Sequence, residues 1–455
     1  MDPTQRIDPN KTMRAPGPGV DPMRTQAMDP FDPLKTSAMP ALMPNGKAVA
    51  VSVTQGRQFT MANGPAREQF LVEINAGGTP GLTASAGART PLNLCLVIDR
   101  SGSMEGPPLD YVKQACTYVV DMLTPNDILS IVTFEETVDV LMPPQRVTSK
   151  QPIKDGIQRL MPGNTTNLYD GLALGMQQVV NTEEQGRATR LVIFTDGDPT
   201  AGIKDFPSLV AKAGEIKDQG VSCTFLGFGP DYNEELLAAM AKRASGNYYY
   251  IPQPQLIPEV FRTELEKLMT VTARNLKLEM KLSRWVTMRG PQQVTSGDVS
   301  IPLTDLERGS AITQVIDLEF PNHPLGAYRV SAGKLTYDDM LTGKTETIEL
   351  DLVQEFSANS AEYSVAVNPQ VSQAAQVAAA SRVVERTIMG LKSGQITQMG
   401  AVADLQKTQA LLVQQGRTQE AQEVTMALRA LQSGDQSGAE KTLMGTMVNL
   451  DQGKR

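Results

Sequence analysis

The chain is poor in the residues that carry most enzyme chemistry. It has 455 residues but only one histidine, His323, three cysteines and one tryptophan. A single histidine excludes a zinc site with two or three histidine ligands within one chain, and it excludes a Ser-His-Asp triad unless His323 is the base. Because no two cysteines form a C-x-x-C pair, we expect neither a cysteine zinc site nor a dithiol redox motif. Any metal should therefore be a hard cation held by oxygen ligands.

Several longer sequence signals are also missing. No run of 18 apolar residues occurs, and no charged start precedes an apolar segment, so we expect neither a membrane span nor a signal peptide. The motif G-x-x-x-x-G-K-[ST] is absent, which argues against nucleotide hydrolysis by a P-loop. The formal net charge of −8 and the pI of about 5.1 argue against nucleic acid as a partner. Together with the few cysteines, these features predict a cytoplasmic protein.

Residues 1–45 are predicted to be a disordered tail, because nine of them are prolines and apolar periodicity is lacking. The tail repeats the motif D-P-x-[K/R]-T. Repeated short motifs are typical of docking or phosphorylation sites, and weak sites gain avidity through repetition. The candidate phosphorylation or docking residues close the three repeats: Thr12, Thr25 and Thr36. The alternative is a linker of biased composition in which Asp-Pro pairs recur by chance.

The rest of the chain divides into four segments by its hydrophobic period. Residues 91–268 alternate apolar strands with amphipathic helices, which predicts an α/β domain with a doubly wound parallel sheet. Residues 46–90 and 269–367 have strand patterns without helices. We predict that they form one antiparallel β-sandwich into which the α/β domain is inserted. Residues 368–455 have helical period, and glycines separate the helices, so we expect a small helical bundle.

Oxygen-bearing side chains follow the predicted strands at their carboxyl ends, where ligands bind in parallel α/β sheets. Asp99, Ser101 and Ser103 form a D-x-S-x-S motif directly after one apolar strand, and Asp196 follows another. A loop before the helix over 168–180 adds a threonine hydroxyl. Five oxygen ligands from three loops suit Mg²⁺ or Mn²⁺. Since only two of them are charged, the ion would stay electrophilic and could accept a carboxylate from a partner.

These motifs resemble the von Willebrand factor A domain with its metal-ion-dependent adhesion site. The motifs that carry the resemblance are Asp99-x-Ser101-x-Ser103, Thr165-Thr166-Asn167-Leu168 and Thr195-Asp196-Gly197. Because the family places its threonine just before Asn-Leu, the resemblance favours Thr166 as the ligand, with Thr165 as the alternative. It implies that the three hydroxyls bind the ion directly, and that Asp99 and Asp196 bind it directly or through water. The ion would be Mg²⁺, with Mn²⁺ or Ca²⁺ as alternatives.

The arrangement of β segments around the α/β region is similar, more loosely, to bacterial A-domain proteins and to inter-alpha-trypsin inhibitor heavy chains. The leading hypothesis is a cytoplasmic scaffold whose Mg²⁺ engages an acidic residue of a partner protein. We do not expect an enzyme, because the site has no candidate base beyond its own ligands. One alternative is a signalling adaptor, in which a kinase modifies the tail threonines and a phosphothreonine-binding protein reads them. Another, taken from the resemblance, is an accessory partner of an AAA-type ATPase.

Overall fold

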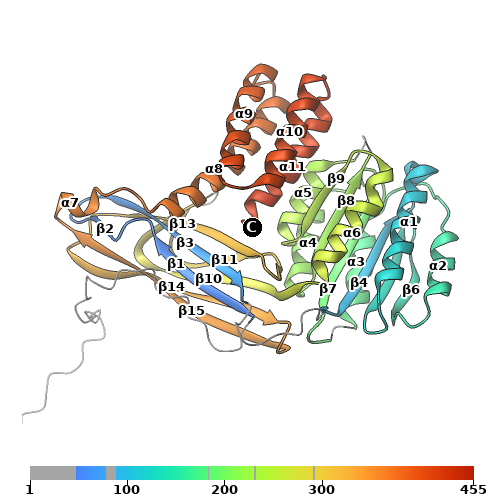
Figure 1. Cartoon of the computed structure of the whole chain (residues 1–455). Coiled ribbons are helices and arrows are strands. Elements are labelled where there is room, and N and C mark those ends of the chain that lie inside the picture. The colour runs from blue at the N-terminus through green and yellow to red at the C-terminus, as the bar shows by residue number, and fades with distance from the viewer. Residues whose placement is uncertain (1–47, 78–88, 183, 230–231, 291–292, 455) are drawn as a thin grey trace, which may run out of the picture. The chain divides into compact units, whose positions relative to one another are not determined.

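The computed structural model describes residues 48–77, 89–182, 184–229, 232–290 and 293–454. These residues form two β-sheets and several helices (Figure 1). The candidate tail sites Thr12, Thr25 and Thr36 lie outside the described residues. None of the helices in the described ranges is long and apolar enough to cross a bilayer.

The first sheet contains the apolar strands of the α/β region. Its strands are β4 (Leu92–Asp99), β5 (Ile128–Phe134), β6 (Val138–Arg146), β7 (Ala188–Thr195), β8 (Ser222–Phe228) and β9 (Asn247–Ile251). They are arranged in the order β6-β5-β4-β7-β8-β9. The strands β4, β5, β7 and β8 are buried along their whole length, because helices cover both faces of the sheet.

One edge of this sheet departs from the predicted all-parallel pairing. The edge strand β6 is antiparallel to β5, whereas the other neighbouring strands are parallel. It contains the pair Pro143-Pro144, which lack the N–H group needed in the middle of a sheet. An edge position tolerates such residues because one side of the strand makes no ladder hydrogen bonds.

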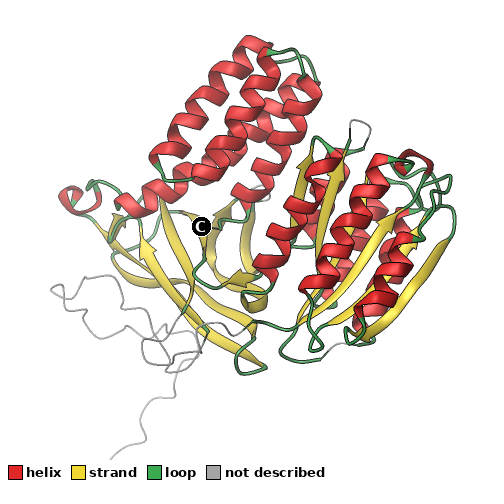
Figure 2. Cartoon of the chain, turned by 45° about the vertical axis from the view of Figure 1, so that its right-hand side comes forward, coloured by secondary structure: helices red, strands yellow, loops and turns green. Residues whose placement is uncertain are grey.

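Helices cover both faces of the six-stranded sheet (Figure 2). They are α1 (Pro107–Met122), α2 (Lys150–Gln158), α3 (Leu168–Val180), α4 (Phe206–Asp218), α5 (Glu234–Arg243) and α6 (Ile257–Leu268), with the short 3-10 turns η2 (Gly102–Met104) and η3 (Pro254–Leu256). One hydrophobic core joins α1, α2 and α6 to one face, and a second core joins α3, α4 and α5 to the other. The doubly wound α/β prediction is thereby confirmed.

The second sheet combines strands from both sides of the α/β region. Its nine strands are β1 (Val49–Gln55), β2 (Phe59–Met61), β3 (Ala66–Ala76), β10 (Val271–Arg289), β11 (Val294–Pro302), β12 (Leu306–Glu307), β13 (Ala311–Phe320), β14 (Gly326–Asp339) and β15 (Lys344–Ser357). The early strands β3 and β2 pair with the late strands β13 and β15. The long strand β10 is paired by backbone hydrogen bonds with four other strands. The pairing therefore describes one continuous sheet, and a sandwich with an inserted domain stays a prediction.

Four long helices follow the short α7 (Ser360–Tyr363). They are α8 (Pro369–Lys392), α9 (Gln398–Gln414), α10 (Thr418–Gln432) and α11 (Gln436–Asp451). The turns between them contain Gly394, Gly416 and Gly434, all with positive φ, as is common just after the end of a helix. Most of their buried apolar side chains belong to the same hydrophobic cluster as those of α3, α4 and α5, whereas Val371 and Ala374 of α8 pack with Leu71 of β3.

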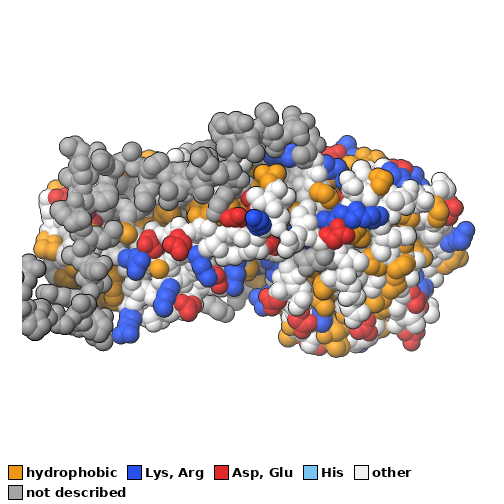
Figure 3. All heavy atoms as spheres, turned by 90° about the horizontal axis from the view of Figure 1, so that it is seen from below, with side chains coloured by type: hydrophobic (Ala, Val, Ile, Leu, Met, Phe, Trp, Pro, Cys, Tyr) orange, Lys and Arg blue, Asp and Glu red, His pale blue; other side chains and the backbone are white. Residues whose placement is uncertain are grey.

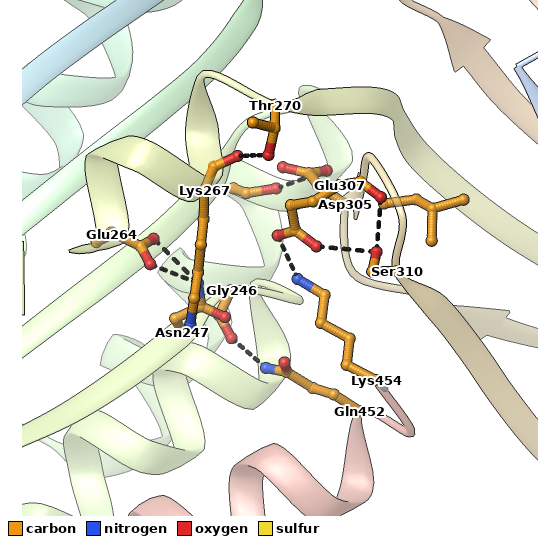
Figure 4. Close-up of polar contacts among 12 residues, drawn as sticks. Gly246, Asn247, Glu264, Lys267, Thr270, Asp305, Glu307, Ser310, Gln452 and Lys454 are labelled. Atoms are coloured by element: carbon orange, nitrogen blue, oxygen red, sulfur yellow. Dashed lines mark hydrogen bonds and ion pairs between the residues drawn. The ribbon is translucent and has the colours of Figure 1, made fainter. Parts of the chain in front are cut away.

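A buried ion-pair network joins the two sheets. From β7, Arg190 donates to Glu264 Oε1 at 2.9 Å and to Asp305 Oδ2 at 2.6 Å. Burial disfavours the charged guanidinium, but the two carboxylates outweigh burial and raise the pKa of Arg190. Glu264 also accepts hydrogen bonds from Thr224, Asn247 and Tyr249. The contact between Glu264 and Asn247 is visible in Figure 4.

The last described residues tie the helical region to both sheets. Gln452 Nε2 donates to the Gly246 carbonyl at 2.6 Å, beside β9. Lys454 Nζ lies 2.7 Å from Glu307 Oε1 of β12 (Figure 4). Between them, the Gly453 carbonyl accepts a backbone hydrogen bond from β13. The segment after α11 is therefore part of the packed structure.

Candidate metal centre

The carboxyl ends of β4 and β7 bring four of the five predicted site residues together. Asp99 ends β4 and Asp196 directly follows β7, and these strands are parallel neighbours. Ser103 Oγ donates to Asp196 Oδ1 at 2.7 Å and lies 3.1 Å from Ser101 Oγ. The Ser101 N–H in turn donates to Asp99 Oδ1 at 2.8 Å. The two carboxylates and two serine hydroxyls therefore form one connected group.

Thr166 contributes the third hydroxyl. A methyl group at the Cβ position of Gly197 would lie 3.5 Å from Ser103 Oγ and 3.9 Å from Thr166 Oγ1, so both hydroxyls face the turn at Gly197. The Thr166 N–H donates to Thr200 Oγ1 at 2.8 Å, which holds the two loops together. The Thr165 hydroxyl is buried and has no hydrogen-bond partner among the described residues. The geometry thus favours Thr166 over Thr165.

Asp99 is the most deeply placed of these side chains, with no exposed surface. Its Oδ2 accepts a hydrogen bond from Thr195 Oγ1 at 2.7 Å. Burial raises the pKa of the Asp99 carboxyl to about 7; hydrogen bonds from Thr195 and Ser101 oppose this rise, and the charge of Asp196 adds to it. A cation beside the two carboxylates would favour their charged forms.

The donor set fits a hard divalent cation. It consists only of oxygen atoms, two carboxylates and three hydroxyls, which is the ligand chemistry of Mg²⁺, Mn²⁺ and Ca²⁺ rather than of soft metals. Across the described ranges, no group of three or more His, Cys, Asp or Glu side chains is placed to hold a metal. The site therefore differs in kind from a carboxylate cage or a thiolate or imidazole centre.

Two supporting residues at this site were not predicted from the sequence. Thr195 fixes the Asp99 carboxylate, and Thr200 accepts the hydrogen bond from the N–H of Thr166. The position of Thr195 carried a signal, since a hydroxyl stands there at the end of an otherwise apolar buried strand. Thr200 carried none, because its role depends on how the loop after β7 folds over the neighbouring loop.

The histidine and the three cysteines, residue types often used as catalytic bases or nucleophiles, are not part of this group of oxygen ligands. The His323 ring, in the loop between β13 and β14, lies 4.0 Å from the ring of Trp285 in β10. The thiols of Cys95, Cys116 and Cys223 are free and buried, and burial raises the pKa of Cys95 to about 12.

On the face shown in Figure 3, the described Lys and Arg side chains are interspersed with Asp and Glu rather than separated by sign.

Residues 93–263 match the family model of the von Willebrand factor type A domain. The chain therefore contains a von Willebrand factor type A domain, as its motifs indicated. Domains of this class bind a divalent metal at the adhesion site and commonly mediate metal-dependent protein–protein interactions.

Similar proteins are found among bacterial and animal sequences. Uncharacterized protein sll0103 of Synechocystis sp. is 28% identical over 340 residues, which are 70% of this chain and 78% of that protein. Human inter-alpha-trypsin inhibitor heavy chain H4 is 26% identical over 239 residues, 45% of this chain, and the match spans only 25% of that relative.

A solved structure shares the fold over most of the chain. It is a von Willebrand factor type A protein from Catenulispora acidiphila, which superposes with a TM-score of 0.65 at 17% identity. The superposition covers 84% of this chain and 91% of the other. Because the likeness extends well beyond the A domain, the parts on either side of it belong to a shared architecture.

Proposed function

We propose that this protein binds partner proteins through a Mg²⁺ ion and that an acidic side chain of the partner binds to that ion. The residues that would hold the ion are Asp99, Ser101, Ser103, Thr166 and Asp196. The observation that carries the proposal is the convergence of three hydroxyls with only two carboxylates at the ends of β4 and β7. Two carboxylates and three hydroxyls would hold a divalent ion without filling its coordination shell, so a carboxylate of the partner could replace a water ligand.

Each residue of the metal site has a definite role in this proposal. Ser101, Ser103 and Thr166 would hold the ion directly, while Asp99 and Asp196 would do so directly or through water. Thr195 orients the buried Asp99 carboxylate by donating to it. When bound, the ion supplies an electrophilic position at the protein surface. Mg²⁺ is favoured because it keeps several water ligands and needs few protein carboxylates, and Mn²⁺ and Ca²⁺ are the alternatives.

The surroundings of the histidine and the three cysteines support binding rather than catalysis. The single histidine packs against Trp285, and the three cysteine thiols are buried. A metal without a positioned nucleophile or base is weak support for hydrolysis. The proposed role is therefore that of a scaffold, and the low cysteine content supports a cytoplasmic setting.

Metal-dependent capture of partners by two matched serine variants tests this function. Ser103 is exposed and hydrogen-bonded to Asp196, whereas Ser300 is an exposed serine of β11 in the other sheet. With Mg²⁺, the immobilised natural chain and the Ser300→Ala control should capture the same set of proteins. EDTA should release these proteins from both. The Ser103→Ala variant should capture none of this set while its circular dichroism stays unchanged. Equal capture by Ser103→Ala, or capture that survives EDTA, would contradict the proposal.

A further inference from the structure

The acidic residues before residue 48 share one sequence context. Residues 1–47 contain five acidic residues, and all of them are aspartates directly followed by proline: Asp2, Asp8, Asp21, Asp29 and Asp32. A residue before proline favours an extended backbone over a helical one. These aspartates are therefore candidate carboxylate ligands for a metal ion, and the chain itself carries five of them.

The surroundings of the metal site complement the charge of these segments. Glu105, two residues after Ser103, and Asp198, two residues after Asp196, are both exposed. A ligand with many acids would be repelled there, whereas one acid followed by a base would be attracted. Three of the Asp-Pro pairs have a basic residue at the third position after the aspartate: Lys11, Arg24 and Lys35.

Exposed apolar side chains that follow or precede the site loops in the chain provide a second kind of complementarity. Met161, Ile203 and Phe206 are 70%, 43% and 45% exposed. They stand close in the chain to the loops that hold Thr166, whose carbonyl accepts from the N–H groups of Thr200 and the residue after it. The Asp-Pro segments also contain apolar residues that recur every few positions: Met23, Met28, Leu34 and Met39. Contact between these two sets would bury apolar surface beside the carboxylate contact.

We propose that the Asp-Pro segments of one copy of this chain are ligands of the metal site of a second copy. The proposal rests on the proposed function, since it needs a bound cation. Each copy carries both a site and several ligands, so the contact is heterologous and extends from copy to copy. Several equivalent ligands on one segment raise the apparent affinity. The repeat motif thus acts through its aspartates, and the threonines are not needed for this contact.

Sedimentation velocity of the full-length chain tests the proposal with two variants of the same segment. The first replaces all five aspartates, as Asp2→Asn, Asp8→Asn, Asp21→Asn, Asp29→Asn and Asp32→Asn. The matched control keeps them and carries Thr12→Val, Thr25→Val and Thr36→Val. Mg²⁺ should increase the association constant of the natural chain and of the threonine variant at least tenfold over EDTA. The asparagine variant should sediment with Mg²⁺ as it does with EDTA.

Binding of Mn²⁺, measured on the same samples by electron paramagnetic resonance, separates this proposal from the proposed function. If Mn²⁺ binds but Mg²⁺ causes no association, the contact between copies is overturned and the metal site stands. Association of the asparagine variant equal to that of the natural chain also overturns the contact. If no Mn²⁺ binds to the natural chain, both proposals fail.

Discussion

Replacing Arg190 by methionine tests whether the buried ion-pair network fastens the two sheets to each other. The Arg190 side chain is 3% exposed, and its partners Glu264 and Asp305 are 0% and 4% exposed. Arg190→Met would remove the cation that donates to both buried carboxylates. Removing one partner from a buried ion pair costs about 3–5 kcal/mol. Because two carboxylates lose the same partner, we expect the free energy of unfolding to fall by about 4–5 kcal/mol.

Urea denaturation followed by Trp285 fluorescence and by far-ultraviolet circular dichroism measures this loss. Trp285 is the only tryptophan and packs against Phe320 in the nine-stranded sheet. The matched control is Arg262→Met, because Arg262 also lies near two carboxylates but is 41% exposed. Exposed pairs contribute about 0–1 kcal/mol. A loss below about 1 kcal/mol for Arg190→Met, or a loss equal to that of the control, would show that the buried network does not stabilise the fold.

A double variant sharpens the same test. If the cost of Arg190→Met comes from uncompensated buried charge, adding Asp305→Asn removes part of that charge. The double variant should then lose less stability than the sum of the two single variants. Strict additivity would show that Arg190 and Asp305 do not interact energetically, whatever their 2.6 Å separation.

Two further predictions concern packing and pH. A Cβ on Gly453 (φ 64°) would lie 2.1 Å from the Thr313 carbonyl oxygen, whereas a Cβ on Gly434 (φ 85°) would meet open space. Gly453→Ala should therefore lower the melting temperature by several degrees more than Gly434→Ala. Equal melting temperatures of the two variants would contradict the packing of the segment after α11 on β13. Burial raises the pKa of the Glu423 carboxyl although Thr446 donates a hydrogen bond to it at 2.9 Å. The folded state therefore binds the carboxyl proton more tightly than the unfolded state does. The free energy of unfolding falls as pH rises through the folded-state pKa of Glu423. Glu423→Gln should therefore raise the melting temperature at pH 8 and lose that advantage toward acidic pH, and identical melting curves at pH 8 would show that the carboxylate is not penalised.

Local patterns were sufficient to predict much of the α/β fold. The helix expected over residues 168–180 is α3, and Pro107-Pro108 opens α1, because proline fits the first turn of a helix. The sequence did not predict β6 and α2. Pro143-Pro144 makes β6 look like a loop, and α2 has only nine residues with Ile153 and Ile157 buried. Both elements lie at an edge of the domain, where the apolar signal is weak.

Individual long-range contacts and the order of the strands were beyond the sequence. Nothing in the local pattern around Arg190 indicates Asp305, which lies 115 positions away. The order of strands in the nine-stranded sheet could not be predicted either. β10 pairs with four other strands, and its local sequence pattern does not specify which ones. At the metal site, the D-x-S-x-S motif was visible because its residues are close in the chain, whereas the contribution of Thr200 depends on two loops meeting.

Isothermal titration of the full chain with Mg²⁺ measures directly whether the residues at the ends of β4 and β7 bind a divalent ion. We expect one ion per chain for the natural protein and for Ser300→Ala. Ser103→Ala should bind Mg²⁺ at least tenfold more weakly, a change of about 1.4 kcal/mol, because it loses one oxygen ligand of the group around Asp196. Absence of Mg²⁺ binding by the natural chain, or equal affinities for the two serine variants, would show that these residues do not hold a metal ion.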